Sequence, residues 1–190
     1  PSQEIPGPAD FAGHGDSNAV VAGSAGFAAA AWGRMGTYLE GKDAGDPVSD
    51  AEQTLLLNGT EIVVSVYDGA GWTSTRLTDN ASPDLAPAVA SNGAGSAVVF
   101  WRSAYTSILD NDSPMNFGTQ DYIMFSRYDS ATKTWSAPQL LYNGTTGAVM
   151  GLQAAMLPDG TAMAVYTLDR GGSGEFRPYD GPDHTDNTGW

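Results

Sequence analysis

The feature of the sequence that most restricts its fold is a segment that occurs twice. YDGAGWTSTRL (residues 67–77) and YDSATKTWSAPQLL (residues 128–141) each place Tyr-Asp before a short turn and a Trp after it, and each run ends in Leu. Gly, Asp and Ser between β-branched and aromatic residues are typical of β-hairpins, because they accept the backbone angles of tight turns. The chain is therefore predicted to contain a repeated β-hairpin.

This hairpin belongs to a longer repeated unit. Residues 20–34 (VVAGSAGFAAAAWGR), 88–102 (AVASNGAGSAVVFWR) and 154–170 (AAMLPDGTAMAVYTLDR) are similar to one another. Trp101 follows Trp32 by 69 residues, and Tyr166 follows Trp101 by 65. A period of about 65 residues is typical of repeated supersecondary units. We predict units at approximately 16–80, 84–145 and 149–190, with the last one incomplete.

Each unit reads as four short antiparallel strands. In the second unit they are APAVAS, SAVVFW, YIMFSRY and WSAPQLL. Residues 28–31 are all Ala and favour a helix by propensity, but the matching residues of the second unit, Val98 to Phe100, predict a strand. Repeated four-stranded sheets predict an all-β, β-propeller-like fold with about two and a half blades and with Trp72 and Trp135 between blades. A β-sandwich is the alternative.

The second hairpin also resembles a known motif. SRYDSATKTW is similar to the Asp-box, Ser-x-Asp-x-Gly-x-Thr-Trp, of secreted bacterial sialidase-like β-propellers. Ser126 comes one place early, Ala131 replaces the Gly and Trp135 comes one place late. The resemblance extends over residues 20–170 and implies a propeller architecture, without implying the activity of that family.

Composition excludes several classes of partner. Eight Lys and Arg against 22 Asp and Glu give a net charge of −14, which repels nucleic acids and anionic membranes. The absence of Cys excludes disulfides and thiolate metal sites. No apolar run approaches the roughly 20 residues that a membrane-spanning helix needs, so we expect no membrane insertion. Abundant Gly and four Asn-x-Ser/Thr sequons favour an extracellular or cell-surface location, with chance occurrence in Asn-rich turns as the alternative explanation of the sequons.

Strand alternation predicts that the long connections share one face of the fold. Residues 33–61, 102–121 and 169–190 are long and acidic, whereas the other turns are short. Because function concentrates on loops carried by a rigid scaffold, we expect any binding site on the long-loop face.

Carboxylates in these connections predict a calcium site, since calcium takes six to eight oxygen ligands. Simple solvation of polar loops is the alternative. The candidate ligands are Asp43, Asp46, Asp50, Asp110, Asp112, Asp180 and Asp183.

Arginines and tyrosines are the candidate ligand-binding residues. Arg34, Arg102 and Arg170 each end the second strand of a unit, and a ring of guanidinium groups could clamp a carboxylated sugar. Ion pairs with the acidic loops are the alternative. Tyr38, Tyr105 and Tyr179 lie nearby, where flat rings could stack on a sugar or anchor a protein partner.

Catalytic groups are sparse in this sequence. His14 and His184 are the two histidines, and no nucleotide, zinc-protease or serine-hydrolase motif occurs. The leading hypothesis is therefore a module that binds glycan or protein. A propeller-type glycoside hydrolase or lyase with a carboxylate pair is one alternative. A structural module completed by further blades or another chain is the other, because open sheet edges recruit partners.

Overall fold

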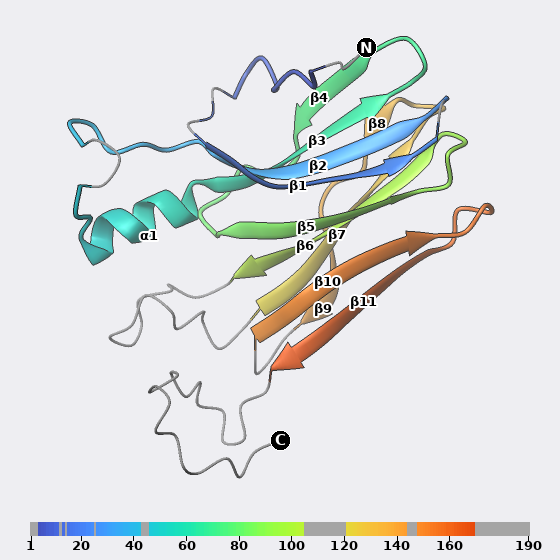
Figure 1. Ribbon diagram of the computed structural model, residues 1–190. Coiled ribbons are helices and arrows are strands. Elements are labelled where there is room, and N and C mark those ends of the chain that lie inside the picture. The colour runs from blue at the N-terminus through green and yellow to red at the C-terminus, as the bar shows by residue number, and fades with distance from the viewer. Residues whose placement is uncertain are drawn as a thin grey trace, which may run out of the picture.

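The computed structural model describes residues 4–11, 13, 15–24, 26–42, 46–104, 121–143 and 148–169. These residues form antiparallel β-sheets and one helix (Figure 1). The prediction of an all-β fold with four-stranded antiparallel sheets is confirmed. The first sheet is a meander of β1 (Gly15–Gly23), β2 (Ala28–Met35), β3 (Thr60–Tyr67) and β4 (Trp72–Arg76). The all-Ala start of β2 pairs with both neighbouring strands, as the repeat predicts.

The second sheet repeats this meander with a broken last strand. It contains β5 (Asp84–Ser91), β6 (Ser96–Ala104) and β7 (Asp121–Asp129), and the short β8 (Thr134–Trp135) and β9 (Gln139–Asn143) both pair with β7. Sequence analysis treated the fourth strand as one run. Pro138 lies in the gap, where a residue without a backbone N–H cannot extend a ladder. A third sheet contains β10 (Ala148–Met156) and β11 (Ala162–Asp169).

The repeated Tyr-Asp-turn-Trp segment forms the β3–β4 and β7–β8 hairpins. Tyr67 pairs with Trp72 and Tyr128 with Trp135, with ring centroids 5.6 and 5.4 Å apart. The Asp that follows each Tyr caps the turn. Asp68 Oδ1 accepts a hydrogen bond from the N–H of Ala70, and Asp129 Oδ1 accepts one from the N–H of Ala131. The sequence repeat therefore encodes an aromatic pair across the hairpin and a carboxylate that holds its turn.

The sheets pack face to face in the order of the chain (Figure 1). One apolar core lies between the first and second sheets and includes Ile62, Val64, Val99 and Trp101. Trp135 packs against this core, as predicted. A second core joins the other face of the second sheet to β10 and β11. It includes Val98, Phe100, Ile123, Val149, Leu152 and Tyr166.

The outer face of the first sheet is covered by the N-terminal segment. Phe11 is buried there with Trp32 and Val63, and Ile5 packs against the same group. Trp72 also packs on this outer face and does not lie between sheets, in contrast to the expectation for this residue. The face that Trp72 would share with a preceding blade is therefore occupied by residues of the same chain.

A β-bulge recurs at the same place in the first strand of every sheet. The pairing register shifts between Ser17 and Val20, between Leu85 and Ala88, and between Met150 and Leu152. The residue inside each bulge has a left-handed backbone, with φ of 54° at Asn18, 50° at Ala86 and 58° at Gly151. Asn and Gly tolerate this conformation, whereas the Cβ of Ala is strained in it.

We predict that Ala86→Gly stabilises the protein by about 1 kcal/mol, because the left-handed conformation costs an L-residue with a Cβ roughly 1–2 kcal/mol. Ala86 is exposed, so the substitution opens no cavity. Urea unfolding measures the change. The control is Ala155→Gly, at an exposed position of β10 without a left-handed backbone, which should lose about 0.5–1 kcal/mol. A loss of stability in Ala86→Gly would contradict this account of the bulge.

Candidate functional site

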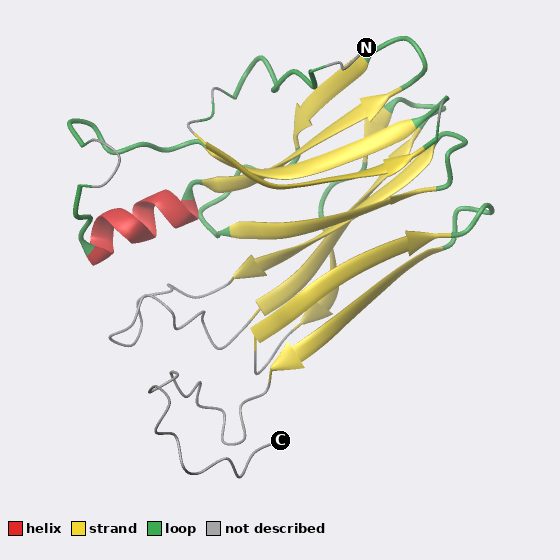
Figure 2. Cartoon of the chain, viewed as in Figure 1, coloured by secondary structure: helices red, strands yellow, loops and turns green. Residues whose placement is uncertain are grey.

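The two ends of the sheets differ in character (Figure 2). The hairpin turns β1–β2, β3–β4, β5–β6, β7–β8 and β10–β11 lie at one end, which we call the turn end. The connection from β2 to β3, which carries α1 (Asp50–Asn58), and the connection from β4 to β5 lie at the opposite end, which we call the loop end. The turn end is joined across sheets, for example by a 3.2 Å hydrogen bond from Ser24 Oγ to the carbonyl of Gly93.

Helix α1 projects from the loop end (Figure 1), and none of its nine residues is buried. Leu55 is 52% exposed, and in the segment before the helix Val48 and Tyr38 are 46% and 56% exposed. Sequence analysis treated this connection as a loop. The signal for the helix is Ser49-Asp-Ala-Glu52, a capping box in which Ser49 Oγ accepts from the Glu52 N–H and the Glu52 carboxylate accepts from the Ser49 N–H.

A local network fixes the start of α1. Lys42 Nζ lies 2.6 Å from the Glu52 carboxylate and 2.8 Å from the carbonyl of Pro47. Hydrogen bonds from Lys42 and Ser49 lower the pKa of Glu52 to about 2. The apolar side chains of α1 are therefore carried on a segment whose first turn is held by several polar contacts.

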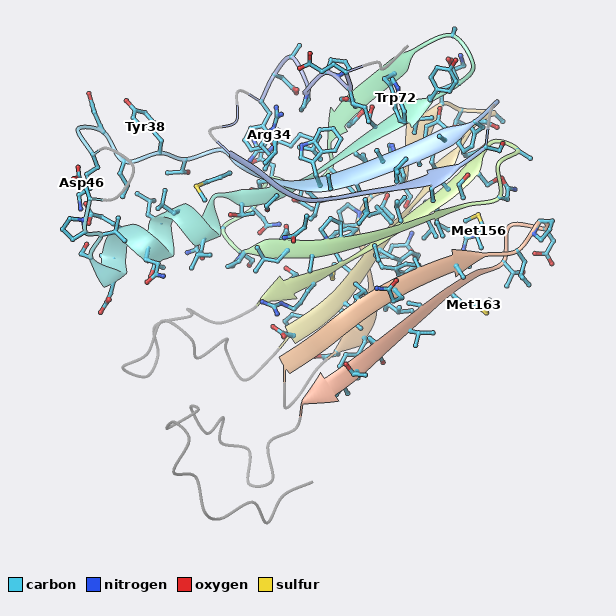
Figure 3. The ribbon with its side chains drawn as sticks, viewed as in Figure 1. Arg34, Tyr38, Asp46, Trp72, Met156 and Met163 are labelled. Carbon is cyan, nitrogen blue, oxygen red and sulfur yellow. The ribbon has the colours of Figure 1, made fainter. Side chains whose placement is uncertain are left out.

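Arg34 and Arg102 are the two members of the predicted ring that the structure describes, and they lie on different faces of their sheets. Arg34 Nε and Nη2 lie 2.7 and 2.8 Å from the two carboxylate oxygens of Asp16, on the outer face of the first sheet (Figure 3). Arg102 lies on the face of the second sheet toward β10, with its Nε 3.7 Å from Asp121 Oδ2. Asp121 ends one of the acidic connections, as the ion-pair alternative expects, whereas Asp16 belongs to β1. Arg170 lies outside the described residues.

Arg34 and Arg102 lie on different sheet faces because they are spaced differently from the Trp of their strands. Arg34 comes two residues after Trp32, whereas Arg102 comes directly after Trp101. Because successive side chains of a strand point to opposite faces, the two arginines lie on opposite faces of equivalent sheets.

Few of the other predicted site residues are described. Tyr38 and Asp46 lie on the connection near α1 (Figure 3), and Asp46 is exposed. Asp50 is exposed in the first turn of α1, where a carboxylate interacts favourably with the helix dipole. Among the residues that the structure describes, no three acidic or His side chains form a metal-binding group, and calcium binding remains a prediction. The other predicted residues lie outside the described ranges: Tyr105, Tyr179, Asp43, Asp110, Asp112, Asp180 and Asp183.

Two buried acids lie next to the β4–β5 connection, and sequence analysis did not select them. Glu61 and Asp84 are each 1% exposed. Asn80 joins them, because its N–H donates to Glu61 Oε1 at 3.0 Å and its side-chain amide donates to Asp84 Oδ2 at 2.8 Å. Arg76 Nη2 donates to Glu61 Oε1, and Trp101 Nε1 donates to Asp84 Oδ1. Burial raises the pKa of both carboxyl groups, and the charge of Asp84 raises that of Glu61 further.

Asp84 also lines a pocket of about 330 Å³ between the first and second sheets. The pocket is lined by Leu77, Thr78, Asp79, Asn80, Asp84, Trp101, Ser103, Met124 and Pro138. Glu61 is not part of this lining, and its carboxylate contacts Arg76 and the N–H of Asn80. The pocket therefore presents one carboxyl group with a raised pKa.

A third buried acid connects the second and third sheets. Asp121 is 0% exposed, and its Oδ2 accepts a 2.7 Å hydrogen bond from the N–H of Val149. Burial raises its pKa, although the nearby Arg102 acts in the opposite direction. All three buried acids stand at or near the loop-end start of a strand, where the sequence offers no signal that distinguishes them from solvated loop acids.

A hollow of about 500 Å³ lies where the first strands of the three sheets meet. It is lined by residues 18–21 of β1, 86–89 of β5 and 152–154 of β10. The left-handed residues Asn18 and Ala86 are part of this lining, whereas Gly151 of β10 is not. Its side chains are mostly small and apolar. The hollow has no charged group in its lining and offers no acid–base chemistry.

Comparison with protein-family models and with curated proteins gives no match for this chain. Within the described residues, the helix present is too short to cross a membrane. Function is therefore argued from the geometry of the sheets, the loop end and the pockets.

We predict that Asp84 makes folding stability fall as the pH rises. Above about pH 4 the unfolded chain releases this proton, while the folded protein retains it because burial raises the pKa of Asp84. The folded protein therefore binds more protons, and stability decreases until the pH passes the raised pKa. In Asp84→Asn this decrease should be smaller. Urea unfolding at a series of pH values between about 2 and 8 measures this decrease and also covers the acid range in which the control is expected to act.

Asp159→Asn is the control, because it removes the same charge. The pKa of Asp159 is lowered by hydrogen bonds from Thr161, so its contribution to stability is present above the ordinary pKa and is lost as the pH falls. In Asp159→Asn, the stability should therefore fall less than in the unaltered chain as the pH drops below about 4. Identical pH profiles for the two variants would contradict the assignment of Asp84.

Proposed function

We propose that the chain is part of an extracellular or cell-surface β-propeller that acts as a binding module, and that its loop end binds a protein partner. The observation that carries this proposal is α1, which projects from the loop end with no buried residue and with Leu55 exposed. An apolar side chain on a projecting element is available to a partner at little cost of rearrangement.

The arrangement of the sheets supports a propeller. Each sheet packs on the next in chain order, and β5 lies beside both β1 and β10. The bulges of β1 and β5, with the residues that follow the bulge of β10, line a common hollow. Neighbouring blades of a propeller are related in this way, with their first strands toward the axis. The third sheet, packed on the face of the second sheet away from the first, favours a series of blades over a sandwich of two sheets.

The composition of the loop end supports a protein partner. Tyr38, Val48 and Leu55 are each exposed on the connection that carries α1, on an acidic molecule, and exposed aromatic and aliphatic anchors in such surroundings are typical of protein interfaces. The net charge of −14 favours a partner whose surface is basic around an apolar pocket, because opposite charge accelerates association.

The third sheet supports the accompanying proposal that further blades or another chain complete the fold. Ala162, Ala164 and Tyr166 pack on the second sheet, so the alternate residues of β11 face away from it. Of these, Met163 (Figure 3) and Val165 are 46% and 69% exposed. Another sheet packed on this face would remove their side chains from water.

The hydrolase alternative needs two carboxyl groups that face one substrate. Asp79 and Asp84 both line the pocket between the first and second sheets. The Asp79 side chain is 80% exposed and paired with Arg76. Asp84 is buried and accepts hydrogen bonds from Asn80 and Trp101. Because both acids already have protein partners, this arrangement favours a structural role for them and supports binding over hydrolysis.

We predict that Leu55→Gln lowers capture of the protein partner at least tenfold, because the substitution removes the exposed apolar anchor without changing the charge or the helix propensity greatly. The immobilised chain is exposed to cell-surface and secreted proteins of its source, and captured proteins are quantified by mass spectrometry. Leu140→Gln is the matched control, since Leu140 is 51% exposed on β9.

A partner captured by the unaltered chain and by Leu140→Gln, but lost with Leu55→Gln, is the expected result. Equal capture by both variants, or capture of nothing above a blank surface, would show that α1 is not the binding element. Helical content and melting temperature are measured for each variant, so that loss of folding is not mistaken for loss of binding.

A further inference from the structure

We propose that a groove between the outer strands of the first and second sheets binds a neutral saccharide. This rim groove has a volume of about 450 Å³ and lies between β4 and β8, away from α1. Its lining includes Thr73, Thr75, Asp68, Tyr128, Lys133 and Trp135. The inference adds a second site to the proposed function and does not depend on the protein partner of the loop end.

The first wall of the rim groove carries hydroxyl groups. Thr73 and Thr75 stand opposite Val66 and Val64 in the β3–β4 pairing, so they belong to the face of the first sheet that packs on the second. The two valines are buried, whereas both threonines are exposed. The sheets therefore diverge toward their outer strands, and the groove is the space that this divergence leaves.

The second wall is aromatic. Trp135 is half-buried, and its ring centroid lies 5.4 Å from that of Tyr128, which is 9% exposed. Contact with the buried phenol ring restricts the indole ring, so that it is ordered before any ligand arrives. A flat aromatic surface facing hydroxyl groups matches the two kinds of surface of a pyranose ring, its C–H face and its hydroxyl rim.

Charge selects among saccharides. Lys133 Nζ lies 3.2 Å from Asp68 Oδ2 at the turn end of the groove, so each neutralises the other. Arg76, which also lines the groove, has Glu61 and Asp79 as acidic partners at 3.1 and 2.7 Å. The lining thus offers no unpaired formal charge to an anionic sugar, and the net charge of −14 repels one.

The volume of the rim groove lies within the range of roughly 300–1,000 Å³ that is usual for small-ligand sites.

The test uses calorimetric titration of the intact chain with neutral hexasaccharides of glucose, mannose, galactose, xylose and N-acetylglucosamine. A hexasaccharide of galacturonate is the anionic comparison. We expect saturable binding of at least one neutral probe. Trp135→Leu should weaken it at least tenfold, because the variant keeps an apolar side chain but loses the flat ring. Thr73→Val with Thr75→Val should weaken it similarly, because valine keeps the shape and the strand propensity of threonine.

Trp72→Leu is the matched control. Trp72 is the counterpart of Trp135 in the first repeat but lies on the outer face of the first sheet, so its loss should leave the affinity unchanged in a folded variant. If Trp135→Leu unfolds, the double threonine variant still tests the groove, because Thr73 and Thr75 are exposed and their substitution should leave the fold intact. Absence of neutral binding, binding of galacturonate alone, or equal affinity in the threonine variant would overturn the proposal. Loss of saccharide binding in Leu55→Gln would assign the sugar to the loop end and would also overturn it.

Discussion

Burial of one sheet face against the next is the interaction on which the rest of the structure depends. Ile62 and Val64 of the first sheet and Val99 and Trp101 of the second are each at most 1% exposed, and they lie in the same core. Burial of each aliphatic side chain of this size contributes roughly 1.5–3 kcal/mol. Without the neighbouring sheet these side chains would face water, so no sheet of this chain is stable as a separate unit. The loop end, the rim groove and the hollow between the first strands are all consequences of this stacking.

Polar groups specify how the apolar faces are aligned. Asp84 accepts hydrogen bonds from Trp101 and Asn80, and Asp121 accepts one from the N–H of Val149 in the next sheet. Buried carboxyl groups are costly unless they are hydrogen-bonded. A third sheet displaced along the second would lose the Asp121–Val149 bond, and displacement of the first sheet would separate Glu61 from Asn80, which also holds Asp84. At the turn end, the Lys133–Asp68 ion pair joins the repeated hairpins of adjacent sheets. Apolar burial supplies the driving force, and the polar contacts favour one register.

The repeat made the sheets predictable, and departures from it account for most of what sequence analysis missed. The all-Ala segment at residues 28–31 was assigned to a strand because its counterpart in the second unit is Val98 to Phe100, and β2 confirms this. Pro138 and the Ser49–Glu52 capping box were visible signals that were not used. Arg34 and Arg102 lie on different sheet faces because their spacing from the Trp of the strand differs by one residue. The buried acids had no sequence signal, since their burial depends on contacts with another sheet.

The central claim, that the repeated hairpins form sheets that pack face to face in chain order, can be tested by a disulfide, because the chain contains no Cys. A Cβ added at Gly93 would lie 3.2 Å from Cβ of Ser24, a few tenths of an ångström below the usual separation of about 3.5–4.5 Å in a disulfide. Gly93 has a left-handed backbone with φ of 69°, so Cys there costs roughly 1–2 kcal/mol, and retained folding of the reduced variant is checked by circular dichroism. Mass spectrometry of Ser24→Cys/Gly93→Cys after mild oxidation is the measurement. The account predicts an intramolecular disulfide that forms in the folded protein much faster than in urea. Thiols that stay reduced, or that link different molecules, would contradict the stacking of the first sheet on the second.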